Sequence, residues 1–150
     1  MVLQMCRGFV KGDEDLAKDI SQEVFINVWN ALEDFRGEAK YKTWIYRITV
    51  NTCLHYLRQA RRKEQLSMDD VSQNLVYQQQ PLEETANHTL YRAIGQLSKV
   101  DRLIIMMVLD ELEKVEISEV MGISPGNLRV KIHRIKKKLR EIVRKEQANG

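Results

Sequence analysis

Proline and glycine are scarce in this chain of 150 residues, which contains only two prolines and seven glycines. Both residues interrupt helices, so their scarcity leaves long stretches in which helices can form. Apolar residues recur in these stretches at steps of three and four, as they do along one side of a helix. The sequence therefore predicts an all-helical protein.

Long hydrophobic runs are lacking as well. No apolar stretch approaches the ~20 residues of a membrane-spanning helix, and no charged start with an apolar core indicates a secretory signal. We therefore expect a soluble protein of the cytoplasm, without membrane insertion.

Residues suited to catalysis or metal binding are few and scattered. Cys6 and Cys53 lack the spacing of a metal site, and two isolated cysteines fit a reducing compartment better than a structural disulfide. The three histidines, His55, His88 and His133, fall in separate segments. The chain has no glycine-rich phosphate loop and no nucleophile beside paired carboxylates. We expect neither an enzyme nor a protein with a cofactor or metal ion.

The charges are unevenly distributed, although the net charge is only +3. Residues 13–38 contain eight acidic side chains, and residues 39–63 contain seven basic ones and no acid. Residues 64–88 are acidic again and have no Lys or Arg. Blocks of alternating sign favour separate surfaces for separate partners.

The most informative pattern is a short helix, a turn at Gly122 and a long basic helix between residues 116 and 140. Glycine adopts the positive φ of such a turn at little cost, and Ser124 followed by Pro125 is typical of a helix start. The long helix has an apolar stripe of Leu128, Ile132, Ile135, Leu139 and Ile142. Its other side is basic, with Arg129, Lys131, Arg134, Lys136, Lys137, Lys138 and Arg140. A basic run alone is usually a solvated surface, but with the turn and the cap it predicts a DNA-binding helix-turn-helix.

The rest of the chain divides into two helical parts. Helices are predicted at about 16–34 and 42–63, with a polar loop at about 36–40 between them. Residues 64–86 have no sustained period and predict a flexible linker. Beyond them we expect a short helix, a cap at Ser98 and a largely buried helix around 103–109. The predicted fold is two small all-α domains, 1–63 and 87–150, joined by the linker 64–86; the second is a four-helix domain with the helix-turn-helix.

Two side-chain sets on the first domain are candidates for binding. One stripe of the second helix carries Trp44, Arg47, Asn51, His55, Arg58 and Arg62. An aromatic ring, an amide and basic groups in line suit single-stranded nucleic acid, although a core tryptophan beside solvated arginines fits the same pattern. Asp19, Gln22 and Glu23 share one face of the first helix. They form either a docking face or a plain solvated one.

The order of these motifs resembles the extracytoplasmic-function group of bacterial RNA polymerase sigma factors. The resemblance rests on residues 19–32, 35–62 and 97–140 and covers most of the chain. It implies a bacterial cytoplasmic factor that directs core RNA polymerase to promoters. The implied partners are the clamp of the beta-prime subunit, the flap of the beta subunit, promoter DNA and, as an open question, an anti-sigma factor.

The resemblance also implies roles for individual residues. Asp19, Gln22 and Glu23 match the family's polymerase-binding positions. The positions that bind the melted minus-ten element are matched by Phe35, Arg36, Gly37, Lys40, Trp44, Arg47, Asn51, His55, Arg58 and Arg62. The positions that bind the duplex minus-thirty-five element are matched by Ser124, Asn127, Arg129, Val130, His133, Arg134 and Lys137.

The sequence departs from the family pattern at two places. Residues 2–20 match only the end of the family's first conserved region, so we expect the first domain to begin partway through. Glu111 stands where the family often has glycine, and we interpret this position as helical. Two rival functions remain: a stand-alone helix-turn-helix regulator, which leaves the first domain unexplained, and an interaction protein that binds polymerase without initiating transcription.

Overall fold

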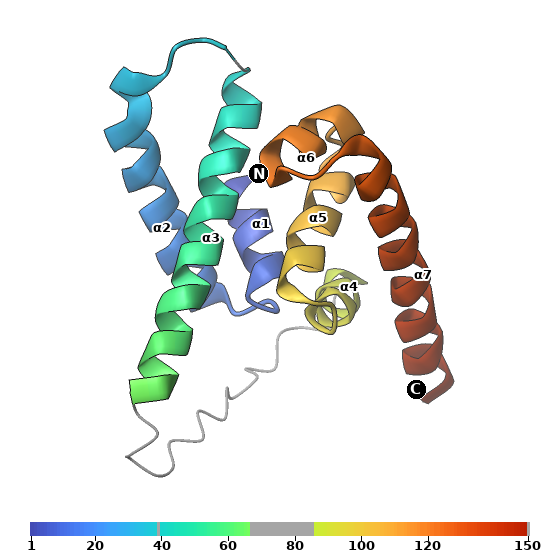
Figure 1. The fold of residues 1–150 in the computed structure, drawn as a ribbon. Coiled ribbons are helices and arrows are strands. Elements are labelled where there is room, and N and C mark those ends of the chain that lie inside the picture. The colour runs from blue at the N-terminus through green and yellow to red at the C-terminus, as the bar shows by residue number, and fades with distance from the viewer. Residues whose placement is uncertain (39, 67–85, 150) are drawn as a thin grey trace.

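The protein is described by a computed structural model that covers residues 1–38, 40–66 and 86–149 (Figure 1). Every regular element within these ranges is helical, which confirms the all-α class. The first half contains α1 (Val2–Phe9), α2 (Glu14–Ala31), the short 3-10 helix η1 (Leu32–Asp34) and α3 (Tyr41–Leu66). The second half contains the four predicted helices α4 (Ala86–Gly95), α5 (Lys99–Leu109), α6 (Lys114–Met121) and α7 (Pro125–Asn149).

The cap predicted at Ser98 is confirmed, and Asp13 caps α2 in the same way. The Asp13 carboxylate accepts a hydrogen bond from the backbone N–H of Leu16 at 3.2 Å, and the Ser98 hydroxyl accepts one from Asp101 N–H at 3.3 Å. The predicted linker 64–86 can be compared with the structure only at its two ends. Residues 64–66 still belong to α3, residue 86 begins α4, and the remainder of the predicted linker lies outside the described residues.

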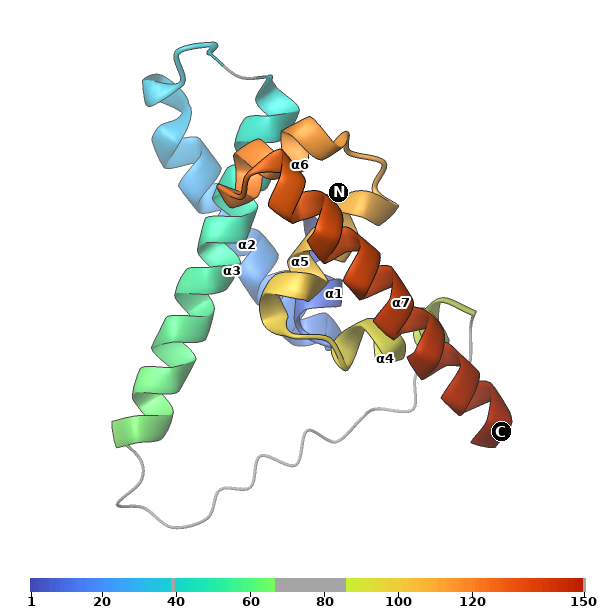
Figure 2. The ribbon, with the colours of Figure 1, turned by 45° about the vertical axis from the view of Figure 1, so that its right-hand side comes forward.

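The two halves share one hydrophobic core. Helix α1 lies between them and contacts α2 and α3 on one side and α4 and α5 on the other (Figures 1 and 2). Its side chains Met5, Cys6 and Phe9 are buried, and so is α5 from Arg102 to Met107. The sequence indicated that α5 would be buried on most sides but did not indicate what would cover it.

The turn after α5 corrects one prediction. Glu111, interpreted above as helical, lies in the left-handed region with φ of 62°. Its N–H donates to Val108 O at 3.1 Å, and the N–H of Leu112 donates to Met107 O at 3.1 Å. These two bonds are the Schellman pattern that ends a helix, and this pattern requires a positive φ at its central residue. The turn lets Leu112 return to the core, which is why a residue other than glycine is held in this conformation.

Cys6 of α1 and Cys53 of α3 are both free and buried, and their side chains hydrogen-bond to each other. This bond lowers the pKa of Cys6 against the opposing effect of burial, whereas the bond and burial together raise the pKa of Cys53. Within the described part of the chain, no cluster of His, Cys, Asp and Glu side chains is arranged to hold a metal ion. Nor does any described helix have the length and apolarity needed to cross a membrane.

Candidate nucleic-acid interface

The helix-turn-helix is formed by α6, a tight turn and α7. Gly122 ends α6 with φ of 66°, and its N–H and that of Ile123 both donate to Ser118 O. Ser124 then caps α7, because its hydroxyl accepts a hydrogen bond from Asn127 N–H at 3.3 Å. The apolar stripe predicted on α7 is buried at Leu128, Ile132 and Ile135 and half-buried at Leu139 and Ile142, and Ile117 and Val120 of α6 are buried as well.

The outer face of α7 is exposed and basic. All predicted minus-thirty-five residues are exposed; Ser124 is the cap that precedes the helix, and the outer face itself contains Asn127, Arg129, Val130, His133, Arg134 and Lys137. The helix runs along the outside of the molecule, and among the described elements none covers this face (Figure 2). Lys131, which the sequence placed on the basic side, instead turns toward α5, where its ammonium lies 3.8 Å from Asp101 Oδ1. The arrangement leaves an exposed, mainly basic face of the kind that helix-turn-helix proteins present to the major groove of DNA.

The stripe on α3 is also accessible along most of its length. Arg47, Asn51, His55, Arg58 and Arg62 are exposed. Trp44, at the start of the stripe, is half-buried. Its ring belongs to an aromatic group at the loop between α2 and α3, where the ring centroid of Phe35 lies 4.8 Å from that of Trp44 and 4.4 Å from that of Tyr41.

Tyr41 is a candidate that sequence reasoning missed. It is 61% exposed, stacks on Phe35 with an interplanar angle of 27°, and lies one helical turn before Trp44. The spacing of three residues between Tyr41 and Trp44 was the available signal. The loop itself is shaped by η1, whose Leu32 O accepts from Phe35 N–H at 3.3 Å, and by Gly37 with φ of 73°. Three rings therefore stand together where the loop enters α3.

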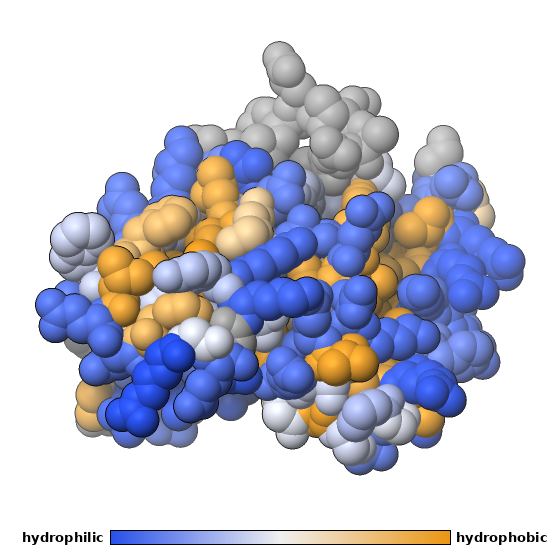
Figure 3. Space-filling model, turned by 90° about the horizontal axis from the view of Figure 1, so that it is seen from above, coloured by the Kyte–Doolittle hydropathy of each residue, from blue (hydrophilic) through white to orange (hydrophobic). Residues whose placement is uncertain are grey.

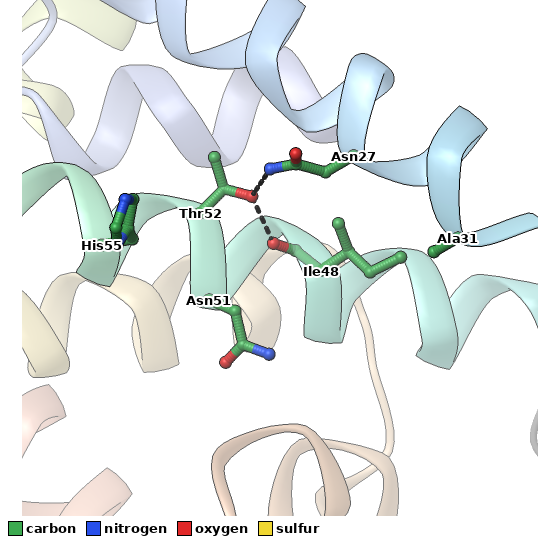
Figure 4. A pocket seen from close by; sticks show the side chains of 6 residues that line it. All are labelled: Asn27, Ala31, Ile48, Asn51, Thr52 and His55. Carbon is green, nitrogen blue, oxygen red and sulfur yellow. Dashed lines mark hydrogen bonds between the residues drawn. The ribbon is translucent and has the colours of Figure 1, made fainter. Parts of the chain in front are cut away.

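A hollow of about 320 Å³ opens beside the stripe, between α2 and α3. Asn27 and Ala31 of α2 line it together with four residues of α3: Ile48, Asn51, Thr52 and His55 (Figure 4). Asn27 Nδ2 donates to Thr52 Oγ1 at 3.0 Å, and Thr52 Oγ1 donates to Ile48 O at 2.7 Å, so these groups are fixed. Figure 4 draws no hydrogen bond from Asn51 or His55 to these groups, and the side chain of Asn51 points away from α2.

The outward face of α2 combines acidic, polar and apolar side chains. Asp19, Gln22 and Glu23 are exposed, as a docking face requires. Beyond them the exposed large hydrophobic residues are Phe25 (57% exposed), Ile26 (59%), Trp29 (75%) and Leu32 (46%). Seen from above, hydrophobic side chains emerge between charged ones at this end of the molecule (Figure 3). Sequence reasoning missed this apolar patch, although the apolar residues from 24 to 29 are too many for one buried side of a helix.

The helix-turn-helix presents an exposed basic helix, and the other helical half has an aromatic and basic stripe. These two features together are typical of DNA-binding proteins that act in transcription. The family model for region 2 of the sigma-70 factors matches residues 1–63, and the model for region 4 matches residues 87–139. The ECF RNA polymerase sigma-E factor of Escherichia coli is 33% identical over 129 residues, which cover 77% of this chain and 68% of the relative. The chain belongs to the extracytoplasmic-function (ECF) sigma factors of the sigma-70 family, the transcription initiation factors that direct RNA polymerase to promoters.

Other comparisons agree. The ECF sigma factor SigW of Bacillus subtilis is 27% identical over 156 residues, covering 95% of this chain and 83% of the relative. Among solved structures, the sigma factor RpoE of Bartonella quintana, in complex with the anti-sigma factor NepR, matches 95% of this chain and 89% of its own with a TM-score of 0.78 at 17% identity. CnrH, in complex with the cytosolic domain of CnrY, matches 95% of this chain and 79% of its own with a TM-score of 0.65 at 22% identity.

The match of the first half to region 2 also argues against one of the two rival functions, the stand-alone regulator. A stand-alone helix-turn-helix regulator would account for the second half only, whereas both halves match the same family. The family resemblance seen in the sequence is therefore confirmed.

Proposed function

We propose that the two halves of this sigma factor bind different parts of the promoter. Residues 1–63 bind core polymerase and the melted minus-ten element, and residues 87–150 bind the duplex minus-thirty-five element, with residues 64–86 joining them. The observation that carries the proposal is the chemical difference between two exposed faces. The α3 face has aromatic rings beside basic groups, which suits unpaired bases, whereas the outer face of α7 is basic without aromatic rings, which suits a duplex groove.

In the proposed minus-ten complex the melted strand runs from the aromatic group along the stripe of α3. Phe35, Tyr41 and Trp44 offer ring faces on which separated bases stack. Next along the stripe, Asn51 and His55 line the hollow, whose volume is at the lower end of the ~300–1,000 Å³ typical of ligand sites. The proposed phosphate contacts come from exposed basic side chains of the loop and of α3: Arg36, Lys40, Arg47, Arg58 and Arg62.

Core polymerase binds the outward face of α2 in this proposal. Asp19, Gln22 and Glu23 contact the clamp of the beta-prime subunit, and the apolar patch extends the same face by two helical turns. Exposed aromatic and aliphatic side chains of this size are typical of the centres of protein interfaces. Basic residues further along α7, such as Lys136 and Lys138, contact DNA phosphates or the flap of the beta subunit.

The proposed mechanism is binding without a catalytic step, in the bacterial cytoplasm. Each DNA contact is weak alone, and selectivity arises because polymerase holds both at a fixed separation, so that the second contact becomes intramolecular. The two solved neighbours are complexes with NepR, an anti-sigma factor, and with the cytosolic domain of CnrY. This supports the further proposal that an anti-sigma protein holds this chain too.

The experiment that tests the division of roles is promoter selection from a randomised library with reconstituted holoenzyme. Arg129→Ala and Arg134→Ala should relax the choice of bases in the upstream element, because a lost base contact costs ~1–3 kcal/mol of discrimination. Arg144→Ala, an exposed basic residue at the far end of α7, is the control and should leave the selected sequence unchanged. Selection of the wild-type upstream sequence by both test variants would contradict the assignment of the recognition helix.

A further inference from the structure

Two thiols meet in the core of the first half, and none of the proposed DNA or polymerase contacts uses them. Cys6 of α1 and Cys53 of α3 are each 0% exposed, and their side chains hydrogen-bond to each other. Among the described residues, no His, Asp or Glu side chain joins them in a group that could hold a metal ion. The two sulfur groups therefore form a pair by themselves.

The buried faces of two packed helices bring the thiols together. On α3 the inward positions include Tyr46, Val50 and Cys53, at steps of four and three. On α1, Cys6 is buried beside Met5 in the same core cluster. Helices α1 and α3 pack directly against each other. Two isolated cysteines in the sequence gave no sign of this pairing, because it depends on how the helices pack.

Other buried polar side chains on α3 do not compete for the thiols. The hydroxyl of Thr49 donates to Ile45 O at 2.8 Å, and that of Thr52 donates to Ile48 O at 2.7 Å. Both hydroxyls thus donate back into their own helix. The hydrogen bond that each cysteine makes with the other is the contact on which its reactivity depends.

This contact divides the roles of the two sulfurs. The thiolate is the reactive form of cysteine. The S–H of Cys53 donates to the sulfur of Cys6 and so lowers the pKa of Cys6, whereas the bond and burial together raise the pKa of Cys53. Cys6 is therefore the first to lose its proton, and a protonated thiol stands directly beside it. An attacking thiolate next to a second cysteine is the arrangement from which disulfides form.

We propose that Cys6 and Cys53 are a peroxide-sensitive dithiol that closes to a disulfide between α1 and α3. The Cys6 thiolate attacks one oxygen of hydrogen peroxide, so that an S–O bond forms, the O–O bond breaks, and the leaving hydroxide takes up a proton to become water. Cys53 then attacks the sulfur of the resulting sulfenic acid. An S–S bond forms, the S–O bond breaks, and the second oxygen leaves as water with the proton of Cys53. The two thiols lose two electrons, which reduce one peroxide to two waters.

Burial decides which oxidants can use this site and what the bond does. Peroxide is hardly larger than water, and it reaches Cys6 when α1 opens locally. This helix has only eight residues and no side-chain cap at its N-terminus, so local opening is expected. The disulfide closes a long loop of the chain and restricts its unfolded state, so the oxidised protein should be the more stable form. The site is independent of the proposed DNA and polymerase contacts.

Oxidation of the reduced full-length chain with hydrogen peroxide tests the proposal. Alkylation under denaturing conditions should find both thiols free before treatment and neither free after it. Peptide mapping without reduction should find the peptides of Cys6 and Cys53 joined. In urea, the midpoint of unfolding should move upward by at least about 1 M and return after treatment with dithiothreitol.

The single variants Cys6→Ala and Cys53→Ala are the controls. They retain the methionines, such as Met5 beside Cys6, which peroxide also oxidises, but they cannot form the bond. Peroxide should not raise their urea midpoints. A rise in either variant as large as in the wild-type chain would mean that another oxidation is responsible and that the dithiol is wrongly assigned.

Two results with the wild-type chain would overturn the proposal without any variant. In the first, both thiols stay free after a peroxide treatment that oxidises glutathione in the same solution, and the cysteines then serve packing alone. In the second, Cys6 is recovered as sulfinic acid while Cys53 remains free. Cys53 would then fail to capture the sulfenic acid, and the two residues would not act as a pair.

Discussion

At the scale of single residues, Glu111 shows how the chain tolerates local strain to end a helix. A left-handed backbone costs a residue with a Cβ roughly 1–2 kcal/mol, while glycine adopts it freely. Glu111→Gly should therefore raise the free energy of unfolding by about 1 kcal/mol, once the greater freedom of glycine in the unfolded chain is subtracted. Urea denaturation measures this change.

The control for Glu111 is the same substitution inside a helix. Glu141 is exposed in the middle of α7, so Glu141→Gly should lower the free energy of unfolding by about 1 kcal/mol. Equal effects at the two positions would show that the turn at Glu111 is not strained.

Trp29 illustrates a residue whose exposure serves binding rather than folding. Because it is 75% exposed, Trp29→Ala should change the free energy of unfolding by less than about 0.5 kcal/mol. If the apolar patch of α2 docks on the polymerase clamp, the same variant should weaken core binding at least tenfold, as expected for an aromatic residue at an interface centre. Fluorescence anisotropy with labelled factor measures the affinity.

Two further variants test the extent of the docking face. Reversing Asp19 and Glu23 to Lys should abolish core binding while the helical CD spectrum stays unchanged. Val115→Ala, an exposed hydrophobic residue of α6, should leave core affinity as it is. Full core binding by the Trp29 variant would remove the apolar patch from the proposed interface.

At the scale of elements, α3 combines a buried side with a side proposed to hold melted DNA. Trp44→Ala and Asn51→Ala should impair promoter opening more than initial duplex binding, because ring and amide meet bases only after strand separation. Loss of one stacking partner costs ~1–3 kcal/mol. Permanganate footprinting of promoter complexes detects the unpaired thymines.

Lys42→Ala serves as the matched control on the same helix, since Lys42 is exposed and lies two residues before Trp44, on the side of the helix away from the stripe. It should leave permanganate reactivity at the wild-type level. Trp44 also contacts Phe35, so thermal unfolding must show that its variant is folded. Wild-type reactivity in both test variants would mean that the stripe does not hold the melted strand.

The helices themselves were largely predictable, for reasons visible in their ends. Asp13 and Ser98 cap helices through local bonds, and Gly122 turns the backbone where the sequence placed it. The end of α5 was not predictable from local sequence, because the positive φ at Glu111 is enforced by the burial of Leu112 rather than by the residue itself. Local signals fix where a helix begins, whereas tertiary contacts decided where this one stops.

In the candidate site, too, local features were predictable from the sequence and contacts between elements were not. The faces of α3 and α7 were predictable because helical spacing alone places their side chains on one side. The role of Tyr41 depends on stacking with Phe35 across the loop, and the hollow beside Asn51 requires α2 to lie alongside α3. The spacing of Tyr41 and Trp44 indicates a shared helix face, but the contacts of Phe35 and of α2 with that face cannot be read from a single sequence.

At the scale of the whole molecule, the continuous core predicts that both halves unfold together. Both tryptophans lie in the first half, so their fluorescence reports on α1–α3, while far-ultraviolet CD reports on all helices. In the wild-type chain the two urea transitions should coincide. In Arg102→Met, which leaves the carbonyls of Phe9 and Gly95 without their charged donor, they should separate and stability should fall by about 3 kcal/mol.

Arg92→Met is the control, because Arg92 is exposed on α4 and its loss should change stability by less than about 0.5 kcal/mol. Coincident transitions in the Arg102 variant would mean that this arginine does not couple the halves. Separate transitions already in the wild-type chain would mean that the halves fold independently.

Met106 of α5 packs over Gly8 of α1 so closely that a Cβ at position 8 would lie 2.5 Å from Met106 Cγ, and the identity of this residue affects how the core responds to substitution. Methionine is unbranched and has a polarizable sulfur, so it adapts to surfaces of different shape with little rearrangement. A branched leucine or isoleucine would fit one partner closely and others poorly. Met106 can therefore change its conformation when a neighbouring core side chain is replaced, so that this contact between α1 and α5 absorbs substitutions that a stiffer side chain would transmit to the two helices.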